Sequence, residues 1–120
     1  LAAKAGSASH AGYHRENNED CVHVDDDYPF ALVLDGMGGQ AAGEHASRRG
    51  ADAVRDTLRR GLDAGRGPRP LIAEALQSGY DAVRRLGRSD PAFRGCGTTV
   101  VLALVHGGRA HVSWLGDSPA

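Results

Sequence analysis

The apolar and polar positions along the chain form two strand-like blocks separated by two helix-like blocks. Short apolar runs at residues 21–24 and 30–34 have the length and composition of strands. The Asp-rich stretch between them, which ends in Pro29, predicts a hairpin turn. A second pair of strand-like runs, at 98–105 and 109–115, flanks a His-Gly-Gly turn.

Between these blocks the apolar residues recur with the period of an amphipathic helix. Residues 43–62 have small and apolar residues at steps of four and arginines mostly elsewhere, which predicts a helix with a solvated arginine face. A Gly- and Arg-rich loop follows, and Pro68 and Pro70 suit the start of a second helix at 71–86. The apolar stripe of that helix comprises Ile72, Ala75, Leu76, Gly79, Tyr80, Val83 and Leu86.

The order strand, strand, helix, helix, strand, strand predicts an α+β fold. We expect antiparallel β-sheet packed on one face by an antiparallel helix pair. A parallel Rossmann unit fits worse, because it needs strands and helices to alternate and the glycines here do not form a GxGxxG motif. A chain of 120 residues holds one core, so it is one domain or part of one.

Residues 30–39, FALVLDGMGG, contain the first candidate chemistry. The apolar run is predicted to end at Asp35, and the glycines after it allow a sharp turn. Antiparallel pairing of the two strands would bring Glu19 and Asp20 close to Asp35 at one end of the sheet. The alternative is that Asp35 is an ordinary turn or capping residue.

Three carboxylates at close range repel one another unless a cation lies between them. Glu19, Asp20 and Asp35 offer hard oxygen ligands without nearby His or Cys, which favours Mg²⁺ or Mn²⁺ over zinc. The backbone carbonyl of Gly36 is a further candidate ligand. Arg15, four residues before Glu19, has the planar donor fork that suits a phosphate group, and a metal beside it suggests phosphoryl hydrolysis. The alternative for Arg15 is an exposed salt bridge to Glu16 or Glu19.

Composition narrows the possible partners. The net charge is −1, with 14 basic and 15 acidic residues, so no overall field favours nucleic acid or an anionic membrane. The longest apolar run, at 100–105, is far shorter than the roughly 20 residues of a membrane span. With no signal-peptide pattern at its start, the chain is expected to be cytoplasmic. Cys21 and Cys96 lack metal-ligand spacing and are expected to be reduced and partly buried.

Four motifs in order resemble the bacterial PP2C-type (PPM) metal-dependent serine/threonine protein phosphatases. They are Arg15-x-x-Asn18-Glu19-Asp20, Asp35-Gly36-Met37-Gly38-Gly39, Gly97-Thr98-Thr99 and Trp114-Leu115-Gly116-Asp117-Ser118. The resemblance implies an α-β-β-α sandwich, of which residues 1–120 would form the N-terminal portion of a single partial domain. It also implies phosphorylated proteins as partners, with hydrolysis of phosphoserine and phosphothreonine by a metal-activated water.

The resemblance assigns roles to individual residues. Asp35 resembles the carboxylate that bridges two Mg²⁺ or Mn²⁺ ions, with Glu19 and the Gly36 carbonyl on one of them. Asp20 resembles the carboxylate that orients the attacking water, and Arg15 the arginine that grips the substrate phosphate. The Gly-Thr-Thr motif at 97–99 is expected to pack beneath the site.

Two departures from the family pattern qualify this expectation. Pro119 stands where the family usually has Arg, and the family's later metal-binding aspartates would lie beyond Ala120. We therefore expect a fragment with about half of the metal ligands. An alternative is a non-catalytic PP2C-like module that binds a phosphoprotein or another partner. A haloacid-dehalogenase-type nucleophile at Asp35 fits poorly, since that chemistry needs a second Asp where Met37 stands.

Overall fold

The computed structural model describes residues 20–115. The elements follow the predicted order: β1 (Asp20–Val24), β2 (Phe30–Met37), α2 (Gln40–Asp63), α3 (Pro68–Ser89), the short 3₁₀ helix η1 (Pro91–Phe93), β3 (Gly97–His106) and β4 (Arg109–Leu115).

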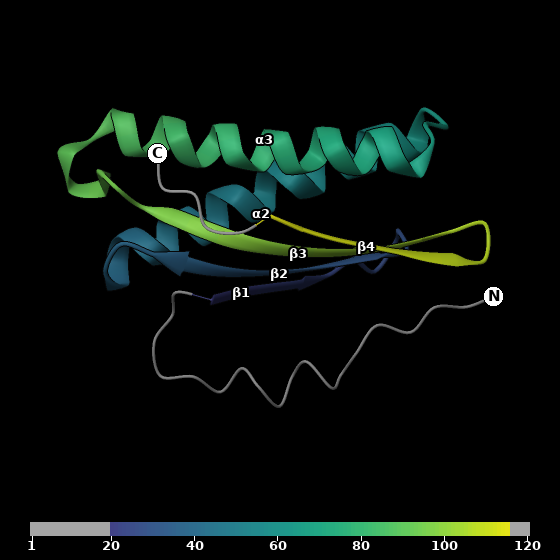
Figure 1. Ribbon diagram of the computed structural model, residues 1–120, viewed down its shortest axis with the longest axis horizontal. Helices are drawn as coiled ribbons and strands as arrows, with labels where there is room; N and C mark the ends of the chain where they lie inside the picture. Colours follow the sequence, from purple (N-terminus) through teal and green to yellow (C-terminus); the bar gives the residue numbers. More distant parts are fainter. Residues whose placement is uncertain (1–19, 116–120) are drawn as a thin grey trace.

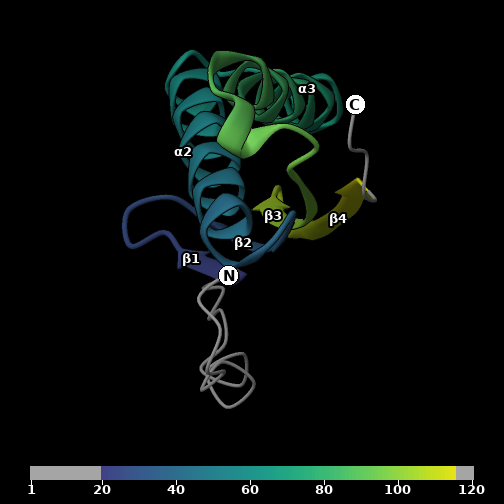
Figure 2. The same cartoon turned by 90° about the vertical axis from the view of Figure 1, so that its left-hand side faces the viewer.

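The four strands form one antiparallel sheet in the order β1-β2-β3-β4. Both helices lie on the same face of this sheet, with α2 closer to the strands at the end where it begins (Figure 1, Figure 2). The helices are joined by a short loop and run in opposite directions. The predicted α+β class, with an antiparallel helix pair on antiparallel sheet, is confirmed.

The second strand ends later than the sequence predicts. Asp35 was expected to be its last residue, but β2 continues to Met37. The reason is pairing with β3, in which Gly36 lies opposite Thr98 and Met37 opposite Gly97. A partner strand stabilises two residues whose intrinsic strand preference is low.

The predicted helical stripe is the inner face of α3. All its members are buried except Tyr80, which is half-buried. α3 extends three residues beyond the predicted stretch at each end, and α2 begins at Gln40 rather than at Gly43.

The core lies between the sheet and the helix pair. Its largest fully buried apolar side chains come from β2, β3 and the helices: Leu32, Leu34, Leu58, Leu71, Leu102, Leu104, Val54 and Val100. Each such side chain contributes roughly 1.5–3 kcal/mol by leaving water, so this layer is the main source of stability.

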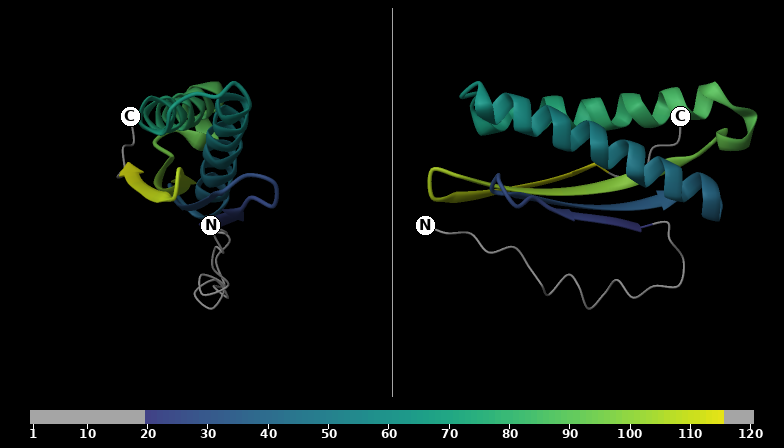
Figure 3. Two further views of the ribbon diagram at one scale, coloured as in Figure 1. Left: turned by 90° about the vertical axis from the view of Figure 1, so that its right-hand side faces the viewer. Right: turned by 180° about the vertical axis from the view of Figure 1, so that it is seen from behind.

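No described element covers the opposite face of the sheet (Figure 3). Val101, Val112 and Trp114 on β3 and β4 are exposed there, Trp114 by 71%. We call the large exposed residues of this face, Val24, Val101, Val112 and Trp114, the outer apolar face.

Both cysteines are free, Cys21 half-buried and Cys96 buried, as expected from their spacing. Burial raises the pKa of both thiols. Between residues 20 and 115, neither helix combines the length and apolar character needed to cross a membrane.

Candidate functional site

The predicted site lies at the end of the sheet where β1 begins and β2 approaches its end. Asp35 is third from the end of β2, and its Cα partner in β1 is Asp20, the first residue of that strand. On the other side, Asp35 pairs with Thr99 of β3. The hairpin thus brings the backbone positions of the two aspartates together, as the antiparallel pairing predicts.

Asp35 lies on the face of the sheet away from the helices. In β2, Phe30, Leu32 and Leu34 are buried against the helix layer, and Asp35 is the one exposed position of the strand. Since successive side chains of a strand point to opposite faces, the Asp35 carboxylate is directed toward the outer face. It is therefore accessible to a ligand from solvent.

Thr98 holds the backbone beside this carboxylate. It is buried, and its Oγ1 lies 3.2 Å from the main-chain oxygen of Asp35 and 3.0 Å from that of Thr99. The single hydroxyl proton can serve one of these acceptors at a time. This agrees with the expectation that the Gly-Thr-Thr motif packs beneath the site, and it adds a contact that the sequence did not predict.

The contact with Thr98 also indicates the direction of the Gly36 carbonyl. The Asp35 carbonyl points toward β3, where it meets Thr98. Successive carbonyls of a strand point in opposite directions within the sheet, so that of Gly36 points toward the β1 side. The Asp35 carboxylate and the Gly36 carbonyl are hard oxygen donors, which fit Mg²⁺ or Mn²⁺.

The described residues hold only part of the predicted ligand set. Arg15 and Glu19 lie outside the described residues, so their predicted proximity to Asp35 remains a prediction. Between residues 20 and 115, no group of three or more His, Cys, Asp or Glu side chains is arranged to bind a metal ion. The described carboxylates therefore do not form a metal site by themselves.

The turn after β2 is short, and one of its two glycines lies close to the segment before β3. Gly38 and Gly39 have φ angles of 115° and 90°, which residues with a side chain rarely adopt. A Cβ on Gly38 would lie 3.0 Å from the Cα of Cys96, just before β3. Gly39 is the N-cap of α2, so only two residues separate the site strand from the helix.

Asp25, at the other end of the hairpin, is a structural residue that the sequence did not single out. Its side chain is fully enclosed, and its Oδ1 accepts hydrogen bonds of 2.9 Å from the backbone amides of Asp27 and Tyr28. Its Oδ2 lies 3.1 Å from Nε2 of His23 and 2.8 Å from Nη2 of Arg59 in α2. Burial by itself raises the pKa of Asp25, but the hydrogen bonds outweigh it and lower the pKa to about 2.

Comparison with known families supports the resemblance drawn from the motifs. The sequence profile of the family described as protein phosphatase 2C matches residues 8–120. The serine/threonine protein phosphatase PstP of Mycobacterium tuberculosis is 32% identical in an alignment of 121 positions that covers 98% of this chain and 22% of PstP. The serine/threonine phosphatase stp of Listeria monocytogenes is 27% identical in an alignment of 110 positions that covers 88% of this chain and 43% of that protein. The chain thus spans less than half the length of these relatives.

Solved structures give the same result for the fold. The PPM Ser-Thr phosphatase MsPP from Mycobacterium smegmatis, in complex with cacodylate, superposes with a TM-score of 0.69 at 29% identity, over 87% of this chain and 41% of MsPP. The catalytic domain of PstP in complex with two manganese ions superposes with a TM-score of 0.66 at 32% identity, over 86% of this chain and 43% of that domain.

Proposed function

Because the chain belongs to the protein phosphatase 2C family, we propose that it forms the N-terminal part of a metal-dependent protein phosphatase domain. The reaction is hydrolysis of phosphoserine and phosphothreonine in phosphorylated proteins. The observation that carries the proposal is the register of β1 and β2, which sets Asp20 opposite Asp35 at an open end of the sheet.

In this proposal the metal ligands from this chain are the Asp35 carboxylate, Glu19 and the main-chain carbonyl of Gly36. Their oxygen chemistry suits Mg²⁺ or Mn²⁺, and the solved PstP domain, with two manganese ions, supports a pair of such ions. Bound there, the ions would supply Lewis acidity at the substrate phosphate. Thr98 supports this arrangement, since its contact with the Asp35 backbone leaves the Gly36 carbonyl directed toward the β1 side.

Asp20 and Arg15 act on the water and the substrate. Asp20, across the hairpin from Asp35, orients the attacking water by accepting its hydrogen bond. Arg15 binds the phosphate oxygens through its planar fork of donors and offsets their negative charge. Neither role requires a covalent intermediate on this chain.

The remaining ligands are proposed to come from sequence that the chain does not contain. The structural match spans 86% of this chain and 42% of a solved PstP chain, so more than half of that solved chain has no counterpart here. The chain would then be part of a single domain, and full activity would require the rest of it.

The test is Mn²⁺ binding and Mn²⁺-dependent hydrolysis of an aryl phosphate and a phosphothreonine peptide, with Asp35→Asn as the variant. We expect Asp35→Asn to weaken Mn²⁺ binding at least about tenfold, because it replaces an anionic ligand with a neutral one. Asp26→Asn removes the same charge from an exposed residue at the other end of the hairpin and should bind Mn²⁺ like the parent chain.

The outcomes separate the candidate functions. Turnover that needs metal and disappears in Asp35→Asn supports the phosphatase. Metal binding without turnover, still lost in Asp35→Asn, fits two candidates that the partial coverage of the relatives allows: a phosphatase site that lacks its remaining ligands, and the alternative of a PP2C-like binding module. Equal Mn²⁺ binding by the parent chain and Asp35→Asn contradicts the proposed ligand role of Asp35.

A further inference from the structure

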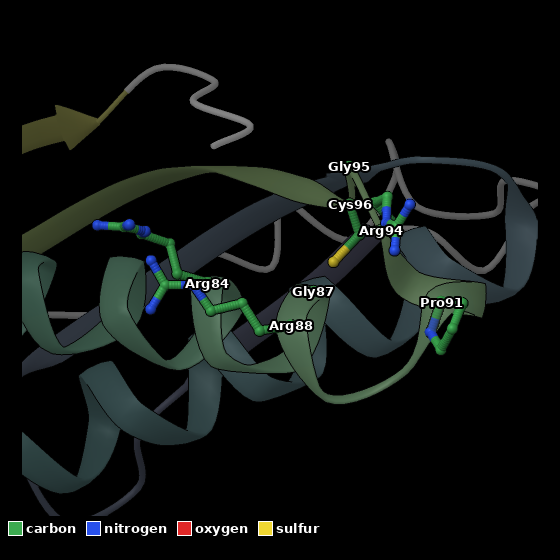
Figure 4. A pocket seen from close by; sticks show the side chains of 7 residues that line it. All are labelled: Arg84, Gly87, Arg88, Pro91, Arg94, Gly95 and Cys96. Atoms are coloured by element: carbon green, nitrogen blue, oxygen red, sulfur yellow. The ribbon is translucent and has the colours of Figure 1, made fainter.

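A group of basic residues lies where α3 ends and the chain returns to β3. A cavity of about 370 Å³ opens there, which we call the arginine pocket. It is lined by Arg84, Gly87, Arg88, Pro91, Arg94, Gly95 and Cys96. Figure 4 shows Arg84 and Arg88 extending in the same direction along α3, away from Arg94, whose side chain lies on the other side of Cys96.

We propose that the arginine pocket binds a phosphate-type dianion. This ligand chemistry is independent of the metal site at Asp35 and does not need the proposed hydrolysis to be correct. Guanidinium groups present planar forks of donors that match the oxygens of phosphate, and three of them line one cavity.

The first argument is the absence of compensating negative charge. None of the residues that line the pocket is acidic. Arg48, Arg55, Arg59 and Arg66 each form an ion pair with a carboxylate. Arg84, Arg88 and Arg94 form none with any residue between 20 and 115, as is also true of Arg49, Arg60, Arg69, Arg85 and Arg109.

The second argument is an unsatisfied donor. Nε of Arg84 is buried and has no hydrogen-bond partner among the described residues. The guanidinium lies 5.5 Å from the centre of the Tyr80 ring, a contact that fixes the side chain without supplying an acceptor. An acceptor close to this group would offset the cost of burying the donor.

The local field also favours an anion. The C-terminal end of α3 carries about half a negative elementary charge from the helix dipole, which opposes anion binding. Three full positive charges outweigh it. Burial raises the pKa of the Cys96 thiol, so at neutral pH this residue adds no negative charge to the pocket.

The helix dipole accounts for only one of the three arginines. Arg88 is in the last turn of α3, where a positive charge stabilises the helix dipole. Arg84 is a full turn earlier, and Arg94 lies outside the helix altogether. The size of the cavity is within the range of roughly 300–1,000 Å³ that holds small ligands or one phosphorylated side chain.

The dianion has two possible sources: free inorganic phosphate or the phosphate ester of a phosphorylated protein segment. The experiment measures how fast phenylglyoxal modifies each arginine of the full 120-residue chain, by peptide mass spectrometry. EDTA is present throughout, which removes the metal site from the measurement. Inorganic phosphate is compared with chloride at equal ionic strength, and a phosphothreonine peptide with its unphosphorylated form.

We expect the ligand to slow modification of Arg84, Arg88 and Arg94 at least about threefold, as expected for a site mostly occupied by its ligand. Arg69 is the matched control, because it is exposed near the opposite end of α3 and does not line the pocket. Protection by inorganic phosphate identifies free phosphate as a sufficient ligand. Protection by the phosphopeptide alone identifies a phosphorylated protein segment.

Three results would overturn the inference. One is an unchanged modification rate for all pocket arginines with both ligands. Another is equal protection of Arg69, which would indicate diffuse attraction rather than a site. The third is protection confined to Arg15, which would support the proposed phosphatase site and not this pocket.

Two variants test whether the three arginines share one site. Arg88→Gln should abolish the protection of Arg84 and Arg94, whereas Arg69→Gln, which removes the same charge from the same helix, should leave it unchanged. Protection that persists in Arg88→Gln counts against a shared site. If Arg88→Gln does not fold, the footprint of the parent chain still decides the question.

Discussion

At the scale of single residues, Asp25 is a carboxylate whose ionised form the fold stabilises. Its folded pKa of about 2 lies below its ordinary value of 3.8, so the fold favours the ionised form. The stabilisation is therefore fully present above about pH 4. It is lost as the pH falls toward 2, because the folded state must then accept a proton.

We predict that Asp25→Asn lowers the free energy of unfolding at pH 7 by about 1 to 2 kcal/mol and flattens its decline between pH 4 and pH 2. Asp26→Asn, an exposed neighbour, should change neither. Urea denaturation at a series of pH values measures both effects. If the free energy of unfolding of Asp25→Asn falls between pH 4 and pH 2 as steeply as that of the parent chain, the role assigned to Asp25 is wrong.

Gly38 gives a second prediction at this scale. Gly38→Ala should destabilise the chain by about 1–3 kcal/mol, because its φ of 115° is strained for alanine and the new Cβ would press on the Cys96 backbone. Gly39→Ala is the matched control, since Gly39 has a φ of 90° but open space around its Cβ position. A larger loss for Gly38→Ala in denaturant unfolding measures the packing contribution. Equal losses would show that backbone strain alone matters.

At the scale of elements, the two helices approach closely where Gly79 of α3 meets Val54 of α2. A Cβ on Gly79 would lie 2.7 Å from Cγ2 of Val54. Forcing an added methyl group into this contact costs about 1–3 kcal/mol of stability. Alanine has a higher helix propensity than glycine, which stabilises the helix by about 1 kcal/mol.

We therefore predict that Gly79→Ala lowers stability by up to about 2 kcal/mol, and that the double variant with Val54→Ala loses less stability than the sum of the two single substitutions. A double-mutant cycle of unfolding free energies measures this coupling. Strictly additive effects of the two substitutions would mean that the contact does not limit the approach of the helices.

The sequence predicted the elements better than their ends. The α3 stripe was readable because its apolar residues recur with the helical period, and that face is the one that is buried. The end of β2 could not be predicted from the local sequence, because Gly36 and Met37 are strand residues only through their partners in β3. A partner 60 or more positions away leaves no local signal.

The same limit applies to the candidate site. The proximity of Asp20 and Asp35 followed from a local hairpin and could be predicted. The enclosure of Asp25 depends on Arg59, 34 residues later, so the turn sequence suggested only an ordinary Asp-rich loop. The arginine pocket joins α3 to the segment before β3, and the helical pattern marked its arginines only as polar positions.

At the scale of the whole molecule, the outer apolar face decides how the chain behaves in solution. The described elements leave Trp114 71% exposed and Val112 57% exposed on one sheet surface. Exposed apolar surface of this kind favours association.

We predict that the isolated chain self-associates and that Val101→Thr combined with Trp114→Thr raises the monomer fraction in sedimentation velocity. Arg69→Gln, which alters an exposed residue outside this face, should leave association unchanged. A monodisperse monomer of the parent chain across a wide concentration range would contradict this prediction.

The ladder of the first hairpin has a consequence for how its length can vary among related sequences. Five Cα pairs connect Val24 with Ala31 beside the turn and Asp20 with Asp35 at the open end. An insertion or deletion inside either strand shifts every pair beyond it and exchanges the two faces of the sheet. A one-residue deletion within positions 21–24 would thus move Asp20 out of register with Asp35 while leaving both residues in the sequence. Length changes are compatible with the site only in the turn, at 26–29, where the ladder can re-form unshifted.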